Sequence, residues 1–205
     1  MMRCVIVGGA GIGDHDRIRG MLRDDDFMIC CDCGLAHMEG LARQPDLIVG
    51  DFDSFENPKM NVETIVLPCE KDDTDTVFAV KEAVRRGFED FLLIGVTGGR
   101  LDHTLGNVYI LTYLDSLGKT ARILDDFSEM KIVGQTPVRV KTCAFFSLLN
   151  ITGLARGITV RNAKYPLENA EIKSEYQYGI SNENLPGEEA VVSVKEGRLL
   201  LIRIL

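Results

Sequence analysis

Acidic residues occur in two short groups whose spacing suits a divalent cation. Asp51 and Asp53 follow the apolar segment 46–49 and are one residue apart. Asp72 and Asp75 form the second group, three residues apart at the expected start of a helix. If the strand continues, its alternation places Asp51 and Asp53 on the same side, and helical spacing does the same for Asp72 and Asp75. Mg²⁺ prefers oxygen ligands, so these acids predict a magnesium site.

A purely structural interpretation of these acids competes with the metal site. Asp beside Gly commonly caps a turn, and Asp51 follows Gly50. The combination of both groups favours the cation, because several carboxylates held close together repel one another unless a cation neutralises them.

Basic residues accompany the acids. Lys71 lies within the second acidic group, and Arg100 follows two glycines that let backbone amides approach an anion. Taken alone, each would be a solvated surface charge, but the combination of acids for Mg²⁺ and cations for phosphate oxygens predicts phosphoryl-type transfer. His103 is either a base or, with Asp102, part of a helix cap. Asp32 ends the second expected strand and could add an acid to the same cleft.

Composition excludes several classes of protein. The chain has 205 residues, 45% of them hydrophobic, and a formal net charge of −8, which does not attract nucleic acid or an anionic membrane surface. No apolar segment approaches the roughly 18–20 residues of a membrane span. The six cysteines lack paired metal-ligand spacing, so we expect reduced thiols and a cytoplasmic protein.

Strands and helices alternate up to about residue 125. Apolar segments bounded by Gly, Pro or Asp predict strands at 4–7, 27–31, 46–49, 64–67, 91–96 and 120–124. Amphipathic segments predict helices at 14–23, 74–86 and 103–117, the last with Leu105, Val108, Leu111 and Leu114 on its buried stripe. This alternation is typical of an α/β fold, a mostly parallel sheet with flanking helices that binds its ligand at the carboxyl ends of the strands.

The pattern changes after Asp125-Asp126. Short alternating segments at 129–133, 138–141, 144–149, 157–161, 190–195 and 198–204 predict a C-terminal antiparallel β-sandwich. We therefore expect two domains, an α/β domain over residues 1–127 and a β-sandwich domain over residues 128–205.

A glycine-rich turn follows the first strand at residues 8–13. It resembles a dinucleotide fingerprint, but Asp14 stands where the third Gly or Ala is required. A tight strand-to-helix turn is the favoured interpretation. The alternative is a non-catalytic nucleotide-binding module, which would leave the aligned acids without a role.

Several motifs together resemble the thiamine pyrophosphokinase (thiamine diphosphokinase) family of the bacterial type. They occur in the family's order over nearly the whole chain: Asp32-x-Gly34, the segment 45–54 ending in Gly50-Asp51-Phe52-Asp53-Ser54, Lys71-Asp72-x-Thr74-Asp75, Gly98-Gly99-Arg100-x-Asp102-His103-x-x-x-Asn107, Tyr165-Pro166-Leu167 and Gly179-Ile180-Ser181-Asn182-Glu183. The Gly-Asp-Phe-Asp-Ser and Lys-Asp-x-Thr-Asp motifs are specific when they occur together.

The resemblance implies an enzyme that moves the pyrophosphoryl group of ATP to the hydroxyethyl oxygen of thiamine and releases AMP. It also implies that residues 1–127 form the catalytic (ATP- and Mg-binding) domain and residues 128–205 the thiamine-binding domain, in a homodimer with active sites at the subunit interface. The implied roles are Mg²⁺ binding by Asp51, Asp53 and Asp75, with Asp72 as the next candidate ligand; ATP binding and transfer by Asp32, Lys71, Thr74, Arg100, Asp102, His103 and Asn107; and thiamine binding by Ser181 and Asn182. Asp72 and Asp102 both remain candidates to orient or deprotonate the thiamine hydroxyl. Another Mg²⁺-dependent nucleotide phosphotransferase or hydrolase is the alternative.

Overall fold

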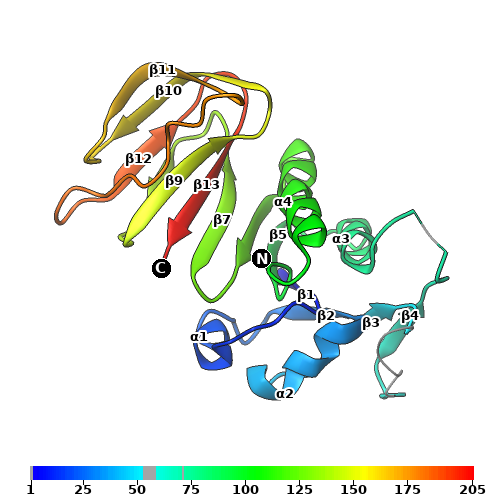
Figure 1. The fold of residues 1–205 in the computed structure, drawn as a ribbon. Helices are drawn as coiled ribbons and strands as arrows, with labels where there is room; N and C mark the ends of the chain where they lie inside the picture. The colour runs from blue at the N-terminus through cyan, green and yellow to red at the C-terminus, as the bar shows by residue number, and fades with distance from the viewer. Residues whose placement is uncertain (1, 53–58, 71) are drawn as a thin grey trace. The chain divides into compact units, whose positions relative to one another are not determined.

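The computed structural model describes residues 2–52, 59–70 and 72–205, so the predicted ligands Asp53 and Lys71 lie outside the described residues. The chain divides into two compact units, Met1–Asp126 and Phe127–Leu205 (Figure 1). The sequence placed the junction one residue later.

A parallel sheet forms the centre of the first unit. Its strands are β1 (Arg3–Val7), β2 (Phe27–Cys31), β3 (Leu47–Gly50), β4 (Glu63–Val66), β5 (Asp90–Ile94) and β6 (Thr120–Leu124). They lie in the order β4-β3-β2-β1-β5-β6, and each neighbouring pair is parallel. β1 is buried along its whole length, as expected for a strand with packed helices on both faces. The predicted α/β class is confirmed.

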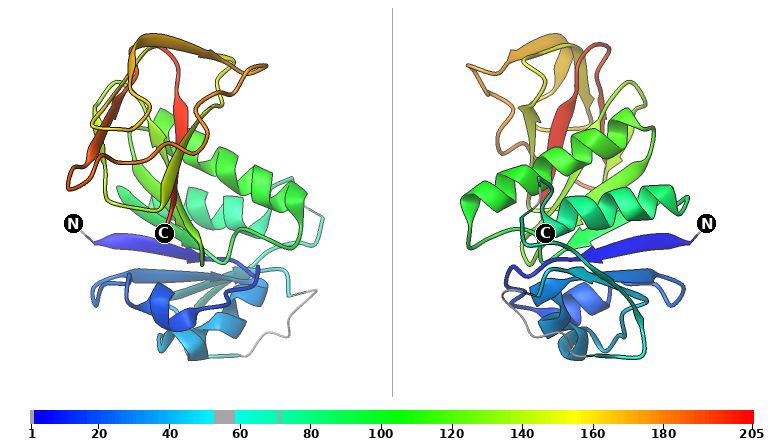
Figure 2. Two further views of the ribbon diagram at one scale, coloured as in Figure 1. Left: turned by 60° about the vertical axis from the view of Figure 1, so that its left-hand side comes forward. Right: turned by 90° about the vertical axis from the view of Figure 1, so that its right-hand side faces the viewer.

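Helices cover both faces of this sheet (Figure 2). One face carries α3 (Asp75–Arg85) and α4 (Leu101–Ser116), and the other carries α1 (His15–Arg19), the 3₁₀ helix η1 (Asp32–His37) and α2 (Met38–Leu41). The sequence predicted α1, α3 and α4 but missed η1 and α2. Both missed helices are short, with six and four residues, which is too few for a periodic apolar pattern to be recognised.

The expected buried stripe of α4 is partly wrong. Leu111 and Leu114 are buried, but Leu105 is 53% exposed, and Ile110 takes part in the buried face instead. The helix is apolar around much of its circumference, so its sequence does not select one face. Packing against β6 selects the face. An apolar stripe stays exposed on α4 and just beyond its end, formed by Leu101, Leu105, Tyr109, Tyr113 and Leu117.

The second unit is entirely antiparallel, as predicted. One sheet contains β7 (Ser128–Val133), β13 (Leu199–Ile204) and β9 (Phe145–Asn150), with β13 between the other two. The other has the order β11-β10-β12-β8, formed by Leu167–Lys173, Leu154–Arg161, Ala190–Ser193 and Val138–Val140. The sequence missed β11, because its residues, Leu-Glu-Asn-Ala-Glu-Ile-Lys, are mostly polar and exposed.

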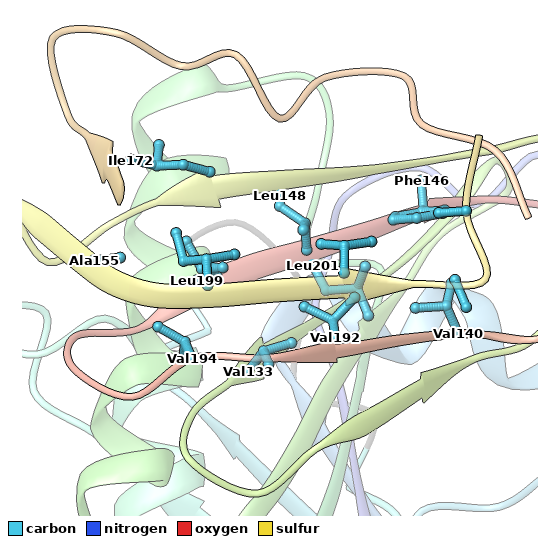
Figure 3. Packing of buried hydrophobic residues seen from close by; sticks show 14 residues of the cluster. Val133, Val140, Phe146, Leu148, Ala155, Ile172, Val192, Val194, Leu199 and Leu201 are labelled. Carbon is cyan, nitrogen blue, oxygen red and sulfur yellow. The ribbon is translucent and has the colours of Figure 1, made fainter. Parts of the chain in front are cut away.

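Apolar side chains fill the core of the second unit (Figure 3). Phe146 and Leu148 from β9 and Leu199 and Leu201 from β13 are buried together with Val192 from β12. Alternate residues of each strand contribute to this core, as the period of two requires. In the part of the chain that the structure describes, no helix has the length and apolar character needed to cross a membrane.

Candidate functional site

The site begins where the strand order of the parallel sheet reverses. The chain runs outward from β1 through β2, β3 and β4 and then returns to place β5 on the other side of β1. Ligands of open α/β sheets bind at such a reversal, outside the carboxyl ends of the strands. The turns after β1 and β5 touch there: a Cβ on Gly8 would lie 2.5 Å from the Gly95 carbonyl oxygen. Only glycine fits this approach.

A cleft of about 610 Å³ opens at this edge of the sheet. The turns after β1, β2, β3 and β5 and the first turns of α3 and α4 line it. The predicted site residues among its lining are Asp32, Asp51, Thr74, Asp75, Arg100, His103 and Asn107. The structure therefore gathers side chains that are up to 75 positions apart in the sequence.

Three carboxylates meet in this cleft. Asp32 follows β2, Asp51 follows β3, and Asp75 begins α3, and one oxygen from each lies within 4.8 Å of the others. An octahedral Mg²⁺ site with bonds of about 2.1 Å has ligand oxygens about 3 to 4 Å apart, and the three carboxylate oxygens lie close to this spacing. The donor set, carboxylate oxygens alone, suits a hard divalent cation.

The backbone that carries these acids is unusual. Asp32 has φ +32° and Phe52 has φ +57°, in the left-handed region that side chains other than Gly seldom adopt. The expected strand continuation through Asp51 and Phe52 is wrong, because β3 ends at Gly50. Left-handed residues that are not glycine are often retained at functional sites, where packing enforces them.

Asp32 is the residue whose position the sequence left most open. The residues alone suggested that it adds an acid to the cleft, and the family resemblance gave it to the ATP site; the structure puts it, 7% exposed, beside Asp51 and Asp75. Its position depends on η1, which the sequence did not predict. The sequence signal that was available is the Asp-x-Gly motif. The motif requires Gly at position 34, because a Cβ there would lie 2.2 Å from the Val7 carbonyl oxygen.

The start of α3 differs from the expected geometry. Thr74 caps the helix, and its hydroxyl accepts a hydrogen bond of 3.3 Å from the backbone N–H of Val77. Asp75 is the first helical residue, where a carboxylate interacts favourably with the helix dipole. Asp72 lies outside the helix and is exposed, so the premise that it shares a helical face with Asp75 is wrong. Asp72 does not line the cleft.

Arg100 and Asp102 form an exposed ion pair at the start of α4. Nη2 of Arg100 donates to Oδ2 of Asp102 at 2.6 Å, and this hydrogen bond lowers the pKa of Asp102 to about 2. Arg100 and His103 line the cleft, but Asp102 does not. Asn107 is buried and donates to the Val96 carbonyl oxygen at 2.8 Å, which ties α4 to the loop after β5.

The thiols of the cleft region fit the expectation of reduced cysteines. All six cysteines are free. Burial raises the pKa of Cys31 well above its usual value, and the neighbouring Cys30 and Asp75 add to this shift. Cys33 lines the cleft, and its Sγ lies 3.5 Å from Oδ2 of Asp32.

The two predicted thiamine-binding residues lie in the second unit and have different surroundings. Ser181 is exposed with φ +58°, and its backbone N–H donates to Oγ of Ser147 at 3.0 Å. Asn182 is 8% exposed, and its amide binds the backbone of Tyr165 twice, accepting from the N–H at 3.0 Å and donating to the carbonyl oxygen at 2.8 Å. Asn182 thus orders the Tyr165 segment.

The fold and the cleft define a class of protein. A parallel sheet with clustered acids at its carboxyl ends, followed in the same chain by an antiparallel β unit, is the architecture of an α/β enzyme with a separate β-sandwich domain.

The chain belongs to the thiamine pyrophosphokinase family, because two family models together match most of its length. "Thiamin pyrophosphokinase, catalytic domain" matches residues 12–123, and "Thiamin pyrophosphokinase, vitamin B1 binding domain" matches residues 133–199. The assignment of the chain as an enzyme of this family follows from these matches and from its relatives.

Individual relatives agree with the family models. A thiamine pyrophosphokinase of Bacillus subtilis is 29% identical over 163 residues, which are 75% of this chain and 76% of the relative. The crystal structure of a thiamin pyrophosphokinase from Geobacillus thermodenitrificans has a TM-score of 0.83 at 27% identity, covering 100% of this chain and 98% of that one. A B. subtilis thiamine pyrophosphokinase structure has a TM-score of 0.86 at 23% identity, covers 100% and 99% of the two chains, and supports the fold.

Proposed function

We propose that this enzyme transfers the pyrophosphoryl group of ATP to the hydroxyethyl oxygen of thiamine, giving thiamine diphosphate and AMP. Membership of the thiamine pyrophosphokinase family supports the diphosphokinase activity. One structural observation supports the proposed binding of ATP and Mg²⁺: Asp32, Asp51 and Asp75 converge in a cleft at the carboxyl ends of parallel strands.

The carboxylates Asp51 and Asp75 are the proposed Mg²⁺ ligands, with Asp32 as the third oxygen donor of the cluster. From the sequence resemblance we keep Asp53 in this set. Bound Mg²⁺ would neutralise phosphate oxygens and hold the polyphosphate in place. The cleft volume of about 610 Å³ lies in the range of ligand pockets for molecules of this size.

The transfer is an in-line displacement at the β-phosphorus. The hydroxyl oxygen of thiamine forms the new bond to this phosphorus, the bond from the β-phosphorus to the oxygen that bridges to the α-phosphorus breaks, and AMP leaves with that oxygen and the bond's electron pair. The hydroxyl proton is released to a base or to water. Positioning and charge neutralisation supply most of the catalysis in such a step.

Individual residues of the chain would contribute charge and orientation. Arg100 lines the cleft and would offset negative charge on the transferred group, together with Lys71 from the sequence motif. His103 and Asn107 would complete the ATP-binding part of the cleft. Thr74 would contribute by capping the start of α3. Asp102 has a pKa of about 2 and is therefore a weak base, which favours an orienting role over proton transfer.

Thiamine binding is proposed for the second unit, where the vitamin B1 binding model matches. The exposed hydroxyl of Ser181 is a candidate hydrogen-bond partner for the pyrimidine, and Asn182 would support that site through its bonds to Tyr165. A cytoplasmic homodimer with active sites at the subunit interface completes the proposal. The exposed apolar stripe of α4 supports association with a second copy.

Product analysis tests this function. The purified protein is incubated with ATP and Mg²⁺, with and without thiamine, and the nucleotides and thiamine esters are separated by chromatography. We expect AMP and thiamine diphosphate in equal amounts, and only when thiamine is present. ADP would indicate a simple kinase, and nucleotide breakdown without thiamine would indicate a hydrolase; either result would contradict the proposal.

A further inference from the structure

Two histidines outside the residues assigned so far hold the glycine turn, residues 8–13, from one side. Nε2 of His37 lies 2.9 Å from the carbonyl oxygen of Ala10, and Nδ1 of His37 lies 3.1 Å from Nε2 of His15. On the other side of the turn, the N–H of Ala10 donates to the Gly95 carbonyl oxygen at 2.8 Å. The peptide groups on both sides of Ala10 are therefore fixed by hydrogen bonds from different elements.

The acceptor decides the tautomer of the pair. A carbonyl oxygen accepts only, so Nε2 of His37 must carry a proton and donate to Ala10. In a neutral ring Nδ1 then accepts, and Nε2 of His15 donates to it. Burial lowers the pKa of His37; the hydrogen bond to Ala10 opposes this shift and the nearby His15 adds to it, and the net lowering favours the neutral form near pH 7. His15, His37 and Ala10 thus form a directed chain of hydrogen bonds.

Fixing the carbonyl of Ala10 also fixes the next N–H. A trans peptide is planar, and its C=O and N–H point in opposite directions. The N–H of Gly11 therefore points away from His37. Gly11 lines the cleft and is exposed. A Cβ added to Gly11 would meet no atom within 4 Å, so there is open space next to this residue. A backbone N–H with a fixed direction beside open space is suited to an anionic oxygen.

We infer that His37, supported by His15, is a positioning residue that orients the Ala10–Gly11 peptide so that the Gly11 N–H binds a phosphate oxygen of the nucleotide. This inference rests on the proposed function, because it requires a polyphosphate in the cleft. It gives the glycine turn a role that the incomplete dinucleotide fingerprint did not assign.

The conservative variant His37→Gln separates this role from simple packing. The amide nitrogen of Gln reaches a position similar to Nε2 of His and donates, whereas Leu in His37→Leu fills space without donating. Binding of the Mg²⁺ complex of α,β-methylene-ATP, an analogue that resists transfer, is measured by calorimetry at pH 7.5. We expect the dissociation constant to rise about tenfold in His37→Leu, the size of one lost hydrogen bond, and to stay within about twofold in His37→Gln.

A second variant perturbs the pair without changing either histidine. A Cβ on Gly40 would lie 2.6 Å from Cδ2 of His15, so Gly40→Ala displaces that ring. We expect a loss of affinity between those of the two His37 variants. Phe88→Leu is the stability control, because it removes the ring contact with Phe27, 5.1 Å between centroids, while leaving the cleft lining intact. It should lower the melting temperature without changing the dissociation constant.

Unchanged affinity in both His37→Leu and Gly40→Ala would overturn the inference, and so would a loss in His37→Gln equal to that in His37→Leu. If the wild-type protein binds the analogue but makes no AMP with thiamine, the proposed function fails while the positioning role is still decided by the variants. If the wild-type protein does not bind the analogue, both fail.

Discussion

The two units differ in the surroundings of some of their buried polar side chains. In the second unit the buried amides serve the backbone: Nδ2 of Asn150 donates to the Ile172 carbonyl oxygen at 2.6 Å, and Asn182 binds Tyr165. In the first unit Asp32 is equally buried, but it meets two other carboxylates in the cleft. Buried amides bonded to backbone stabilise a fold, whereas clustered acids oppose it unless a cation is present. The proposed chemistry therefore belongs to the first unit, and the proposed thiamine recognition belongs to the surface of the second.

The largest expected effect is on catalysis in the first unit. Asp75→Asn keeps the shape of the side chain but removes one charge from the three-acid cluster, so we expect turnover to fall by about 10³-fold through lost metal binding. Asp73→Asn is the matched control, since Asp73 is in an ion pair with Lys81 at 2.6 Å and does not line the cleft. Initial rates of AMP formation measure both. Equal rates in the two variants would contradict the assignment of the cluster.

The next effect is on the stability of the second unit. Phe146→Ala removes a fully buried ring from the core and should lower the free energy of unfolding by about 3–5 kcal/mol. Its neighbour on the same strand, Phe145, is 44% exposed, so Phe145→Ala should cost less than about 1 kcal/mol. Urea unfolding followed by circular dichroism checks both values. Similar losses would mean that the strand alternation of β9 is incorrect.

A third effect concerns backbone packing beneath the cleft. Gly34→Ala places a Cβ 2.2 Å from the Val7 carbonyl oxygen, and we expect a loss of about 2–3 kcal/mol as η1 moves away from β1. The same change at Gly106, where no atom lies within 4 Å, should instead stabilise α4 by about 0.5–1 kcal/mol. Thermal unfolding shows whether each variant is less or more stable than the wild-type protein. A stabilised Gly34→Ala protein would contradict the close approach.

The smallest effect is a dependence of stability on pH. Burial lowers the pKa of His37 below 6.5, the value of an unperturbed ring. Below about pH 6.5 the unfolded chain therefore binds a proton that the folded protein binds less readily. The stabilisation is complete above this pH and is lost as the pH falls toward the lower folded pKa. In His37→Gln this part of the decline should be absent, as urea titrations at pH 7.5, 6.5 and 5.5 would reveal.

Periodicity and turn residues predicted the parts of the fold that follow local rules. The bounds of β2 and β6 are as predicted, and α3 begins one residue after the predicted helix start at Thr74. Failures occur where local rules conflict with packing. β11 is polar and was missed, and α4 buries Ile110 rather than Leu105, because both of its faces are apolar. The acids of the cleft were chosen from motif and spacing, but the alternation argument for residues 51–53 failed at Phe52, because a left-handed residue ends the strand pattern.

Residue types and their order determined the class of this protein: alternating strands and helices, then short strands, with acids after the strands and motifs of one family. Only the tertiary structure decided that Asp32 joins Asp51 and Asp75, that Asp72 lies outside the cleft lining, and that His15 and His37 support the glycine turn. The physical reason is distance along the chain. Contacts between residues tens of positions apart depend on the direction in which each strand end and short helix leaves the sheet, and no local pattern encodes that direction.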